Sequence, residues 1–313
     1  MHISISRLIE DALNYIEVRL TQKVNLEEIA QSFHLSKYHL HRLLSHAVGM
    51  PVMNYIRARK MSASLPLLLD DRLRIVDIGN HFGFEHEQSY IRAFKKHFGI
   101  TPALFRKEMP ELVLTEKADI SRWKEIEEGI IFAPTIVFKP SISLVGVKHT
   151  IDHEENVQYF TANQAGNDFF YNHRPLVKQR VQEHIYIGLT RYPSWDERKF
   201  TYYTPSAQVS SLEELPPGME GNLLPPSKYA VFTYVGGFHP KHLTIRHLEE
   251  IWSYIDRYVQ FNNPGFRQSD LYHFEYIDES IATDDYCEIG IYLPIQSLPQ
   301  TDIVEPIIDR FAQ

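Results

Sequence analysis

Apolar residues near the start of the chain recur at the three- and four-residue spacing of an α-helix that buries one face. Residues 5–20 predict one such helix, with the apolar stripe Leu8, Ile9, Ala12, Leu13, Ile16 and Leu20. Two shorter helices follow, capped by Asn25 and Ser36, because these side chains accept hydrogen bonds from free N–H groups at a helix start. The second ends at Gly49. A short helix, a tight turn and a capped second helix predict a helix-turn-helix unit.

The same arrangement recurs about fifty residues later in the chain. Residues 74–102 read as a short helix, a turn that contains glycine and a second helix. Residues 52–69 predict the helix that connects the two units. Pro66 lies inside this connecting helix, where it removes a backbone hydrogen bond, so we expect a kink or an early end. Two units on one rigid connector have the geometry to enter successive segments of a DNA major groove, ~34 Å apart.

The hydrophobic period changes from that of a helix to the two-residue alternation of strands after residue 137. Strands are predicted at residues 141–151, 183–192, 199–211, 229–238, 271–278 and 286–295. Helical segments are predicted at 154–183 and 241–261. Each half therefore reads strand–helix–strand–strand. Two such units pairing at their edges give an antiparallel sheet with helices on one face and an open groove on the other.

These periods predict two domains, and 313 residues are enough for two hydrophobic cores. An all-α double helix-turn-helix domain is expected at residues 1–108. An α+β domain made of a duplicated βαββ unit with an antiparallel sheet is expected at residues 138–313. The charged stretch at 109–137 is expected to be a linker.

The charge of the chain divides at the same place. Residues 1–108 hold 15 Lys and Arg against 11 Asp and Glu, a net charge of +4, whereas the whole chain carries −8. The remainder therefore carries −12. A basic first third suggests a polyanionic partner for that part and a different task for the acidic remainder.

The sequence offers few candidate residues for a metal site or for redox chemistry. Cys287 is the only cysteine, which excludes a disulfide framework and any multi-cysteine metal site. The histidines between His34 and His46 show spacings that suit metal ligands, but no cysteine or paired carboxylate joins them. We therefore expect no metal and no cofactor. The sequence shows no signal peptide and no apolar run of ~18 residues, so we expect a cytoplasmic protein with no membrane partner.

Two stretches carry a resemblance to a known family. The segments GFEHEQSYIRAFKKHFGITPALFR and SKYHLHRLLSHAVGMPVMNYIRARKM resemble the two helix-turn-helix units of AraC/XylS-type transcription regulators. The resemblance implies double-stranded DNA as a partner, together with RNA polymerase. It places base contacts on two helices, at Tyr38, His41 and Arg42 and at Gln88, Ser89 and Arg92.

The chemistry of these side chains agrees with that assignment. Arginine pairs with guanine and glutamine with adenine through two hydrogen bonds each, and an aromatic ring is able to lie against a thymine methyl group. Basic side chains nearby suit phosphate oxygens, which set register rather than sequence. The predicted phosphate contacts are Lys37, Arg59, Lys95 and Lys96.

Residues 138–313 resemble the gyrase-inhibitor-like (GyrI-like) effector-binding domain, on the stretches YAVFTYVGGF, FEYID and EIGIYLPI. By this resemblance Glu275 matches the acidic residue at the centre of the pocket. Strand alternation adds Tyr186, Glu288 and Tyr292 as candidates for the open groove, and Trp252 and Phe232 are further candidates for its wall. Aromatic walls around a carboxylate suit a small amphipathic or aromatic effector, including a cationic one.

The leading interpretation is a one-component transcription regulator without enzymatic activity, in which one chain both binds the effector and reads DNA. Two alternatives stay open for the C-terminal domain. A glutamate such as Glu275 or Glu288 in an aromatic groove has the chemistry to activate water against a reactive small molecule. The groove also has the features to dock a protein partner. The oligomeric state is not predicted.

Overall fold

The computed structural model describes residues 4–126, 128–195, 199–262 and 265–298. The chain divides into two compact units, residues 1–124 and residues 125–313. None of the described helices combines the length and the apolarity that a membrane crossing requires.

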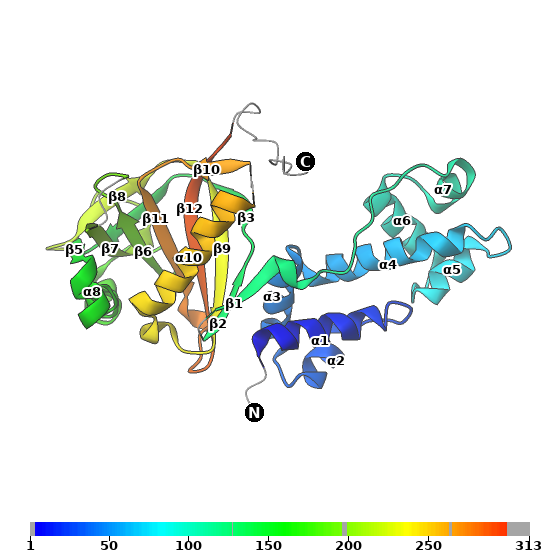
Figure 1. The fold of residues 1–313 in the computed structure, drawn as a ribbon, viewed down its shortest axis with the longest axis horizontal. Coiled ribbons are helices and arrows are strands. Elements are labelled where there is room, and N and C mark those ends of the chain that lie inside the picture. The colour runs from blue at the N-terminus through cyan, green and yellow to red at the C-terminus, as the bar shows by residue number, and fades with distance from the viewer. Residues whose placement is uncertain (1–3, 127, 196–198, 263–264, 299–313) are drawn as a thin grey trace, which may run out of the picture. The chain divides into compact units, whose positions relative to one another are not determined.

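The described residues of the first unit form seven α-helices. They are α1 (Ile5–Glu17), α2 (Leu26–Ser32), α3 (Lys37–Val48), α4 (Val52–Leu68), α5 (Ile75–His81), α6 (Glu87–Phe98) and α7 (Pro102–Glu108). The pairs α2–α3 and α5–α6 are the two predicted helix-turn-helix units, and α4 connects them (Figure 1). This confirms the expected all-helical first part of the chain.

The predicted helix ends are present. The side chain of Asn25 accepts a hydrogen bond from the Glu27 amide, and that of Ser36 accepts one from the His39 amide. Gly49 ends α3 in the left-handed conformation, with φ of 72°. Pro66 lies in the last turn of α4, which ends two residues later at Leu68. The proline therefore coincides with the end of the connecting helix.

The second unit is a sheet with helices. Its strands are β1 (Trp123–Ile126), β2 (Gly129–Phe132), β3 (Thr135–Lys139), β4 (Ile142–Gly146), β5 (His149–Asp152), β6 (Ile185–Arg191), β7 (Phe200–Val209), β8 (Glu220–Leu224), β9 (Ser227–Gly236), β10 (Phe266–Gln268), β11 (Tyr272–Asp278) and β12 (Cys287–Ser297). Its α-helices are α8 (His153–Tyr159), α9 (Thr161–Asp168) and α10 (Ile245–Phe261). The expected α+β class is therefore confirmed.

The central strands lie in the order β9-β12-β11-β6-β7-β4, and their pairings are antiparallel. In chain order the first half runs β4 and β5, α8 and α9, β6, β7, and the second half runs β9, α10, the short β10, β11, β12. Strands β6 and β11 pair at the centre of the sheet. The expected linker at 109–137 also contributes to this sheet, because β2 and β3 both pair with β9.

The two faces of the sheet are both covered with apolar side chains. On one face Phe232, Ile289 and Ile291 pack with Ile251 and Ile255 of α10, which lies across the strands (Figure 1). The other face carries a second cluster that includes Leu189, Tyr229 and Phe274. A residue's alternation along its strand therefore decides whether it faces the helices or the second cluster.

Candidate DNA-reading helices and ligand cavity

The outer face of α3 carries the first predicted set of base-contacting side chains. Tyr38 is 52% exposed in the first turn. Arg42 follows one turn later, and its Nη1 donates to the Tyr38 hydroxyl at 3.2 Å. The guanidinium carbon lies 5.6 Å from the centre of the Tyr38 ring. His41 is half-buried beside Arg42. The pair places a planar cation and an aromatic edge together at the start of the helix.

Helix α6 presents the second set at its N-terminal end. Gln88 and Arg92 are exposed, and Ser89 is half-buried. Arg92 donates from Nε to the Gln88 carbonyl at 3.2 Å, one turn away. Opposite this face, Tyr90 and Phe94 are fully buried in the core between α4 and α6. Burial of the apolar face of α6 therefore leaves its polar face directed toward solvent.

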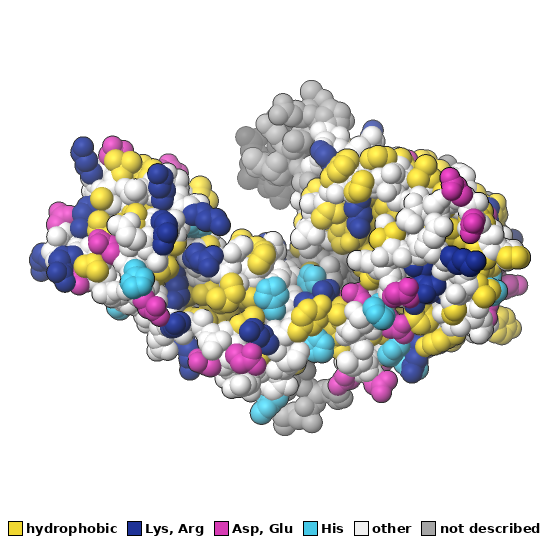
Figure 2. Space-filling view, turned by 180° about the vertical axis from the view of Figure 1, so that it is seen from behind, with side chains coloured by type: hydrophobic (Ala, Val, Ile, Leu, Met, Phe, Trp, Pro, Cys, Tyr) yellow, Lys and Arg dark blue, Asp and Glu magenta, His cyan; other side chains and the backbone are white. Residues whose placement is uncertain are grey.

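Lysine and arginine side chains gather around the α5–α7 end of the first unit (Figure 2). Lys95 and Lys96 are exposed in the last turn of α6. Lys37 is exposed at the start of α3, where it lies 3.6 Å from a carboxylate oxygen of Glu27. These three lysines remain accessible to a phosphate group.

Arg59 differs from this set. Its guanidinium forms two hydrogen bonds to the Glu17 carboxylate, at 2.9 and 2.7 Å, and its side chain is only 14% exposed. It also donates to the Thr115 carbonyl. The position of Arg59 does not support the predicted phosphate contact, because Glu17 of α1 already pairs with its charge.

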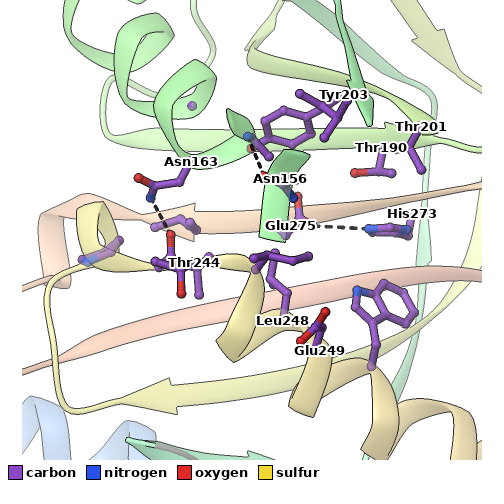
Figure 3. A pocket seen from close by; sticks show the side chains of 18 of the residues that line it. Asn156, Asn163, Thr190, Thr201, Tyr203, Thr244, Leu248, Glu249, His273 and Glu275 are labelled. Carbon is purple, nitrogen blue, oxygen red and sulfur yellow. Dashed lines mark hydrogen bonds and ion pairs between the residues drawn. The ribbon is translucent and has the colours of Figure 1, made fainter. Parts of the chain in front are cut away.

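A cavity of about 720 Å³ lies in the second unit, between the helices and the sheet (Figure 3). Side chains from α8, α9, β6, β7, α10 and β11 line it. Leu248, Glu249 and Trp252 enter from α10, and Asn163 from α9. This volume is in the range of pockets that bind small organic molecules.

Glu275 of β11 lies in the wall of the cavity and is 5% exposed. Its Oε1 lies 3.3 Å from Nε2 of His273, which is 3% exposed. Its Oε2 is buried and has no hydrogen-bond partner among the described residues. Tyr192 contacts the far side of His273 through a 3.2 Å hydrogen bond to Nδ1. A buried carboxylate oxygen without a partner is unfavourable, so it favours a ligand that brings a donor or a positive charge.

Two tyrosines complete the surroundings of this carboxylate. The hydroxyls of Tyr186 and Tyr203 lie 2.6 Å apart. Burial raises the pKa of both phenols above their ordinary range, so both stay neutral and act as hydrogen-bonding groups. Gly188 lies beneath them, and a Cβ atom at this position would collide with Oε2 of Glu275 and with the Tyr203 hydroxyl. The glycine therefore leaves room for the carboxylate.

The cavity lining is acidic. It holds the carboxylates of Glu249, Asp256, Glu275 and Glu279, against the cations Lys241 and Arg257. Burial raises the pKa of Glu279 above its ordinary value. No group of three His, Cys, Asp or Glu side chains within the described ranges has the arrangement of a metal site.

Comparison with known families separates the same two parts. Residues 29–108 match the family described as a helix-turn-helix domain. Residues 132–296, more than half of the chain, match the GyrI-like small molecule binding domain.

Individual relatives agree with these matches. The HTH-type transcriptional activator AarP of Providencia stuartii is 37% identical over 101 residues, which cover 32% of this chain and 75% of AarP. The transcriptional regulator Rob of Salmonella typhimurium is 28% identical over 241 residues, 73% of this chain and 78% of Rob. The chain belongs to the AraC/XylS family of transcription regulators. This AraC/XylS regulator is a DNA-binding protein with a GyrI-like small molecule binding domain.

The cavity of the regulator brings together three of the predicted ligand-contacting residues, Glu275, Tyr186 and Trp252. The other three lie elsewhere. Phe232 is fully buried under α10 and packs against Tyr258.

Glu288 and Tyr292 lie on the opposite face of the sheet from the cavity. The reason is register, because Glu275 of β11 is paired with Ile291 of β12, which puts the neighbours of Ile291 on the other side. There Tyr292 stacks on Phe274 at 4.6 Å, and Glu288 accepts a hydrogen bond from the Tyr286 hydroxyl. The expected groove on the helix-free face is corrected to a cavity on the helix-covered face.

Sequence reasoning missed most of the residues that line the regulator's cavity, among them His273, Tyr203 and Asn163. His273 alternates with Glu275 along β11 and so shares its face, which strand alternation alone was able to indicate. Tyr203 of β7 meets Tyr186 of β6 only through the pairing of these strands. The asparagine side chains of α8 and α9, such as Asn163, carried no signal in the sequence.

Proposed function

We propose that this AraC/XylS regulator is a one-component sensor whose cavity binds a small aromatic or amphipathic cation and whose two recognition helices read a bipartite DNA site. The observation that carries the ligand class is the buried Oε2 of Glu275, which has no partner among the described residues. A ligand changes transcription through different affinities for two states of the protein.

The base contacts are assigned to Tyr38, His41 and Arg42 of α3 and to Gln88, Ser89 and Arg92 of α6. Their support is position, since each set lies on the outward side of the second helix of a helix-turn-helix unit, the part that enters a major groove. Lys37, Lys95 and Lys96 are assigned to phosphates. RNA polymerase is a proposed partner.

Selection of bound duplexes from a random-sequence pool tests the DNA assignment. The expected product is a motif with two halves about one helical turn apart. Replacing Arg92 by Ala should weaken binding by about 1–3 kcal/mol and relax base preference at one position only. An equal loss on every sequence would show that Arg92 does not read a base.

The cation assignment predicts a specific charge dependence. Benzyltrimethylammonium and its uncharged carbon isostere have the same shape, so their difference in affinity isolates the effect of charge. Glu275→Gln should lower affinity for the cation by about 10- to 100-fold, because it removes the Coulombic attraction between the buried carboxylate and the charge of the ligand, roughly 1.4–2.8 kcal/mol. Affinity for the neutral isostere should stay unchanged.

Glu288→Gln is the matched control, since Glu288 is a buried carboxylate on the opposite face of the same sheet. It should leave cation binding intact. If both substitutions weakened cation binding equally, Glu275 would not be a residue that contacts the cation. Turnover of an electrophilic compound that is lost in Glu275→Gln would instead favour hydrolysis.

The sheet supports a further proposal, that the second domain is a duplicated βαββ unit. The two halves place corresponding strands at mirrored positions, with β6 and β11 at the centre and β4 and β9 outside them. The domain limits proposed from the sequence, residues 1–108 and 138–313, leave β2 outside the second domain although it pairs with β9, and the ends at 1–3 and 299–313 lie outside the described residues.

A further inference from the structure

A segment with little regular structure follows the last helix of the DNA-binding unit. Residues 112–123, here called the strap, contain a single turn of 3-10 helix, η1 (Ile120–Arg122), and end on Trp123, the first residue of β1, which lies on the N-terminal side of the boundary between the two units. Their position between two domains predicts a free linker. Instead, the strap forms hydrogen bonds to helices that are up to 117 residues away in the chain.

The first part of the strap is fastened to the second helix-turn-helix unit and to α4. Leu112 packs against the core that contains Phe94. The Thr115 amide donates to Oγ of Ser62 at 3.0 Å, and the Thr115 hydroxyl lies 3.4 Å from Nε2 of His97 in α6. Arg59 donates to the Thr115 carbonyl. One strap residue thus contacts both the connecting helix and the second recognition helix.

The second part of the strap is fastened to α4, α1 and α3. The Ala118 amide donates to the Tyr55 hydroxyl at 3.1 Å, and Lys117 donates to Oδ1 of Asn14 in α1 at 2.6 Å. Arg122 donates from Nε to the Ala47 carbonyl in the last turn of α3, at 2.9 Å. That carbonyl is one of those that a helix end leaves without an internal partner.

The last strap residue is Trp123, which is 5% exposed and donates from Nε1 to Oγ of Ser6 at 2.9 Å. The strap is therefore attached at both ends and at its middle. A single helix such as α4 bends at low cost, whereas a helix with a second chain fastened along it at several points bends only if those contacts break.

We propose that the strap is a positioning element that fixes the spacing and orientation of α3 and α6 for a bipartite DNA site. This inference rests on the proposed reading of DNA by both helices. It extends the functional DNA-binding unit to residue 123.

The test measures how affinity depends on the separation of the two half-sites. Duplexes carry the selected halves at centre-to-centre separations of about 9 to 12 base pairs, around one helical turn. The double variant Ser62→Ala/Arg122→Gln is made in the full chain. It removes the hydroxyl that accepts from the Thr115 amide and the guanidinium that donates to the Ala47 carbonyl, and it changes no residue assigned to a DNA contact. Val113→Ser is the matched control, because Val113 lies in the strap but is 89% exposed.

The wild-type chain and the control should prefer one separation sharply. The double variant should lose about tenfold at that separation, change little at the others, and bind an isolated half-site normally. Hydrogen exchange at the Thr115 and Ala118 amides should show that the strap has detached. If they stay protected, Ala118→Pro removes that donor outright and is measured in the same way.

A detached strap with an unchanged separation profile would overturn the proposal. So would an equal loss at all separations and on the isolated half-site, which a simple loss of stability would produce. A wild-type chain without any preferred separation would instead overturn the bipartite reading itself.

Discussion

Lys60 lies in the middle of α4 and is 7% exposed, which is unusual for a lysine. Its ammonium group donates to the carbonyls of Gln22 and Phe82, at 2.6 and 2.7 Å. The first carbonyl lies between α1 and α2 and the second ends α5, so one side chain joins the segment before the first helix-turn-helix unit to the second unit. Burial lowers the pKa of Lys60 from 10.5 to about 8.

This shift predicts a dependence of stability on pH. Between pH ~8 and ~10.5 the unfolded chain binds this proton and the folded chain releases it, so the contribution of Lys60 to the free energy of unfolding rises with pH. Denaturant unfolding of the wild type and of Lys60→Met at about pH 7.5 and 9.5 measures it. From about pH 7.5 to 9.5, the free energy of unfolding of the wild type relative to that of Lys60→Met should rise by on the order of 1 kcal/mol. A difference that does not move, or moves the other way, would contradict the assignment.

At the scale of elements, the two faces of the sheet in the second unit have different roles, since one carries a packed apolar cluster and the other lines the cavity. Tyr292 stacks on Phe274 with planes 10° apart on one face, and Trp252 of α10 lies 4.4 Å from His273 at the cavity on the other. Tyr292→Ala should lower the free energy of unfolding by about 2–4 kcal/mol, since it removes a large side chain from a packed cluster. It should leave ligand affinity unchanged.

Trp252→Ala should show the reverse pattern, with weaker ligand binding and a smaller loss of stability, because Trp252 lines the cavity whereas Tyr292 packs inside the second apolar cluster. Chemical unfolding and calorimetric titration of the two variants decide the matter. If Tyr292→Ala lost ligand binding at temperatures where it is folded, the ligand would have to bind on the face of the sheet opposite the cavity, which would contradict the assignment.

At the scale of the whole molecule, a chain of net charge −8 binds a polyanion through a local concentration of cations. Each lysine on a phosphate releases counterions, so Lys96→Ala should reduce the slope of log affinity against log salt by about one unit. Arg59→Gln should leave the slope unchanged, because Glu17 already pairs with Arg59. Fluorescence anisotropy over a salt series measures both. A reduced slope in Arg59→Gln would mean that this arginine leaves Glu17 to contact DNA.

The sequence by itself determined the elements of this protein. The spacing of apolar residues located both helix-turn-helix units, and the caps at Asn25, Ser36 and Gly49 fixed the ends of their helices, because these signals involve residues within a few positions of one another. The two-residue alternation located β4 to β7, β9, β11 and β12 in the same way, whereas β1 to β3 fall in the stretch expected to be a linker, and β8 and β10 were not predicted. Family resemblance marked Glu275, which does lie in the cavity.

Only the tertiary structure decided which partners these side chains have. Arg59 pairs with a carboxylate 42 residues away, and the face of Glu288 and Tyr292 follows from the register of β12 against β11. The strap at 112–123 has no period, so nothing local distinguishes it from a free linker. Contacts between distant parts of the chain depend on how the elements pack, and a pattern read over a few residues does not contain that information.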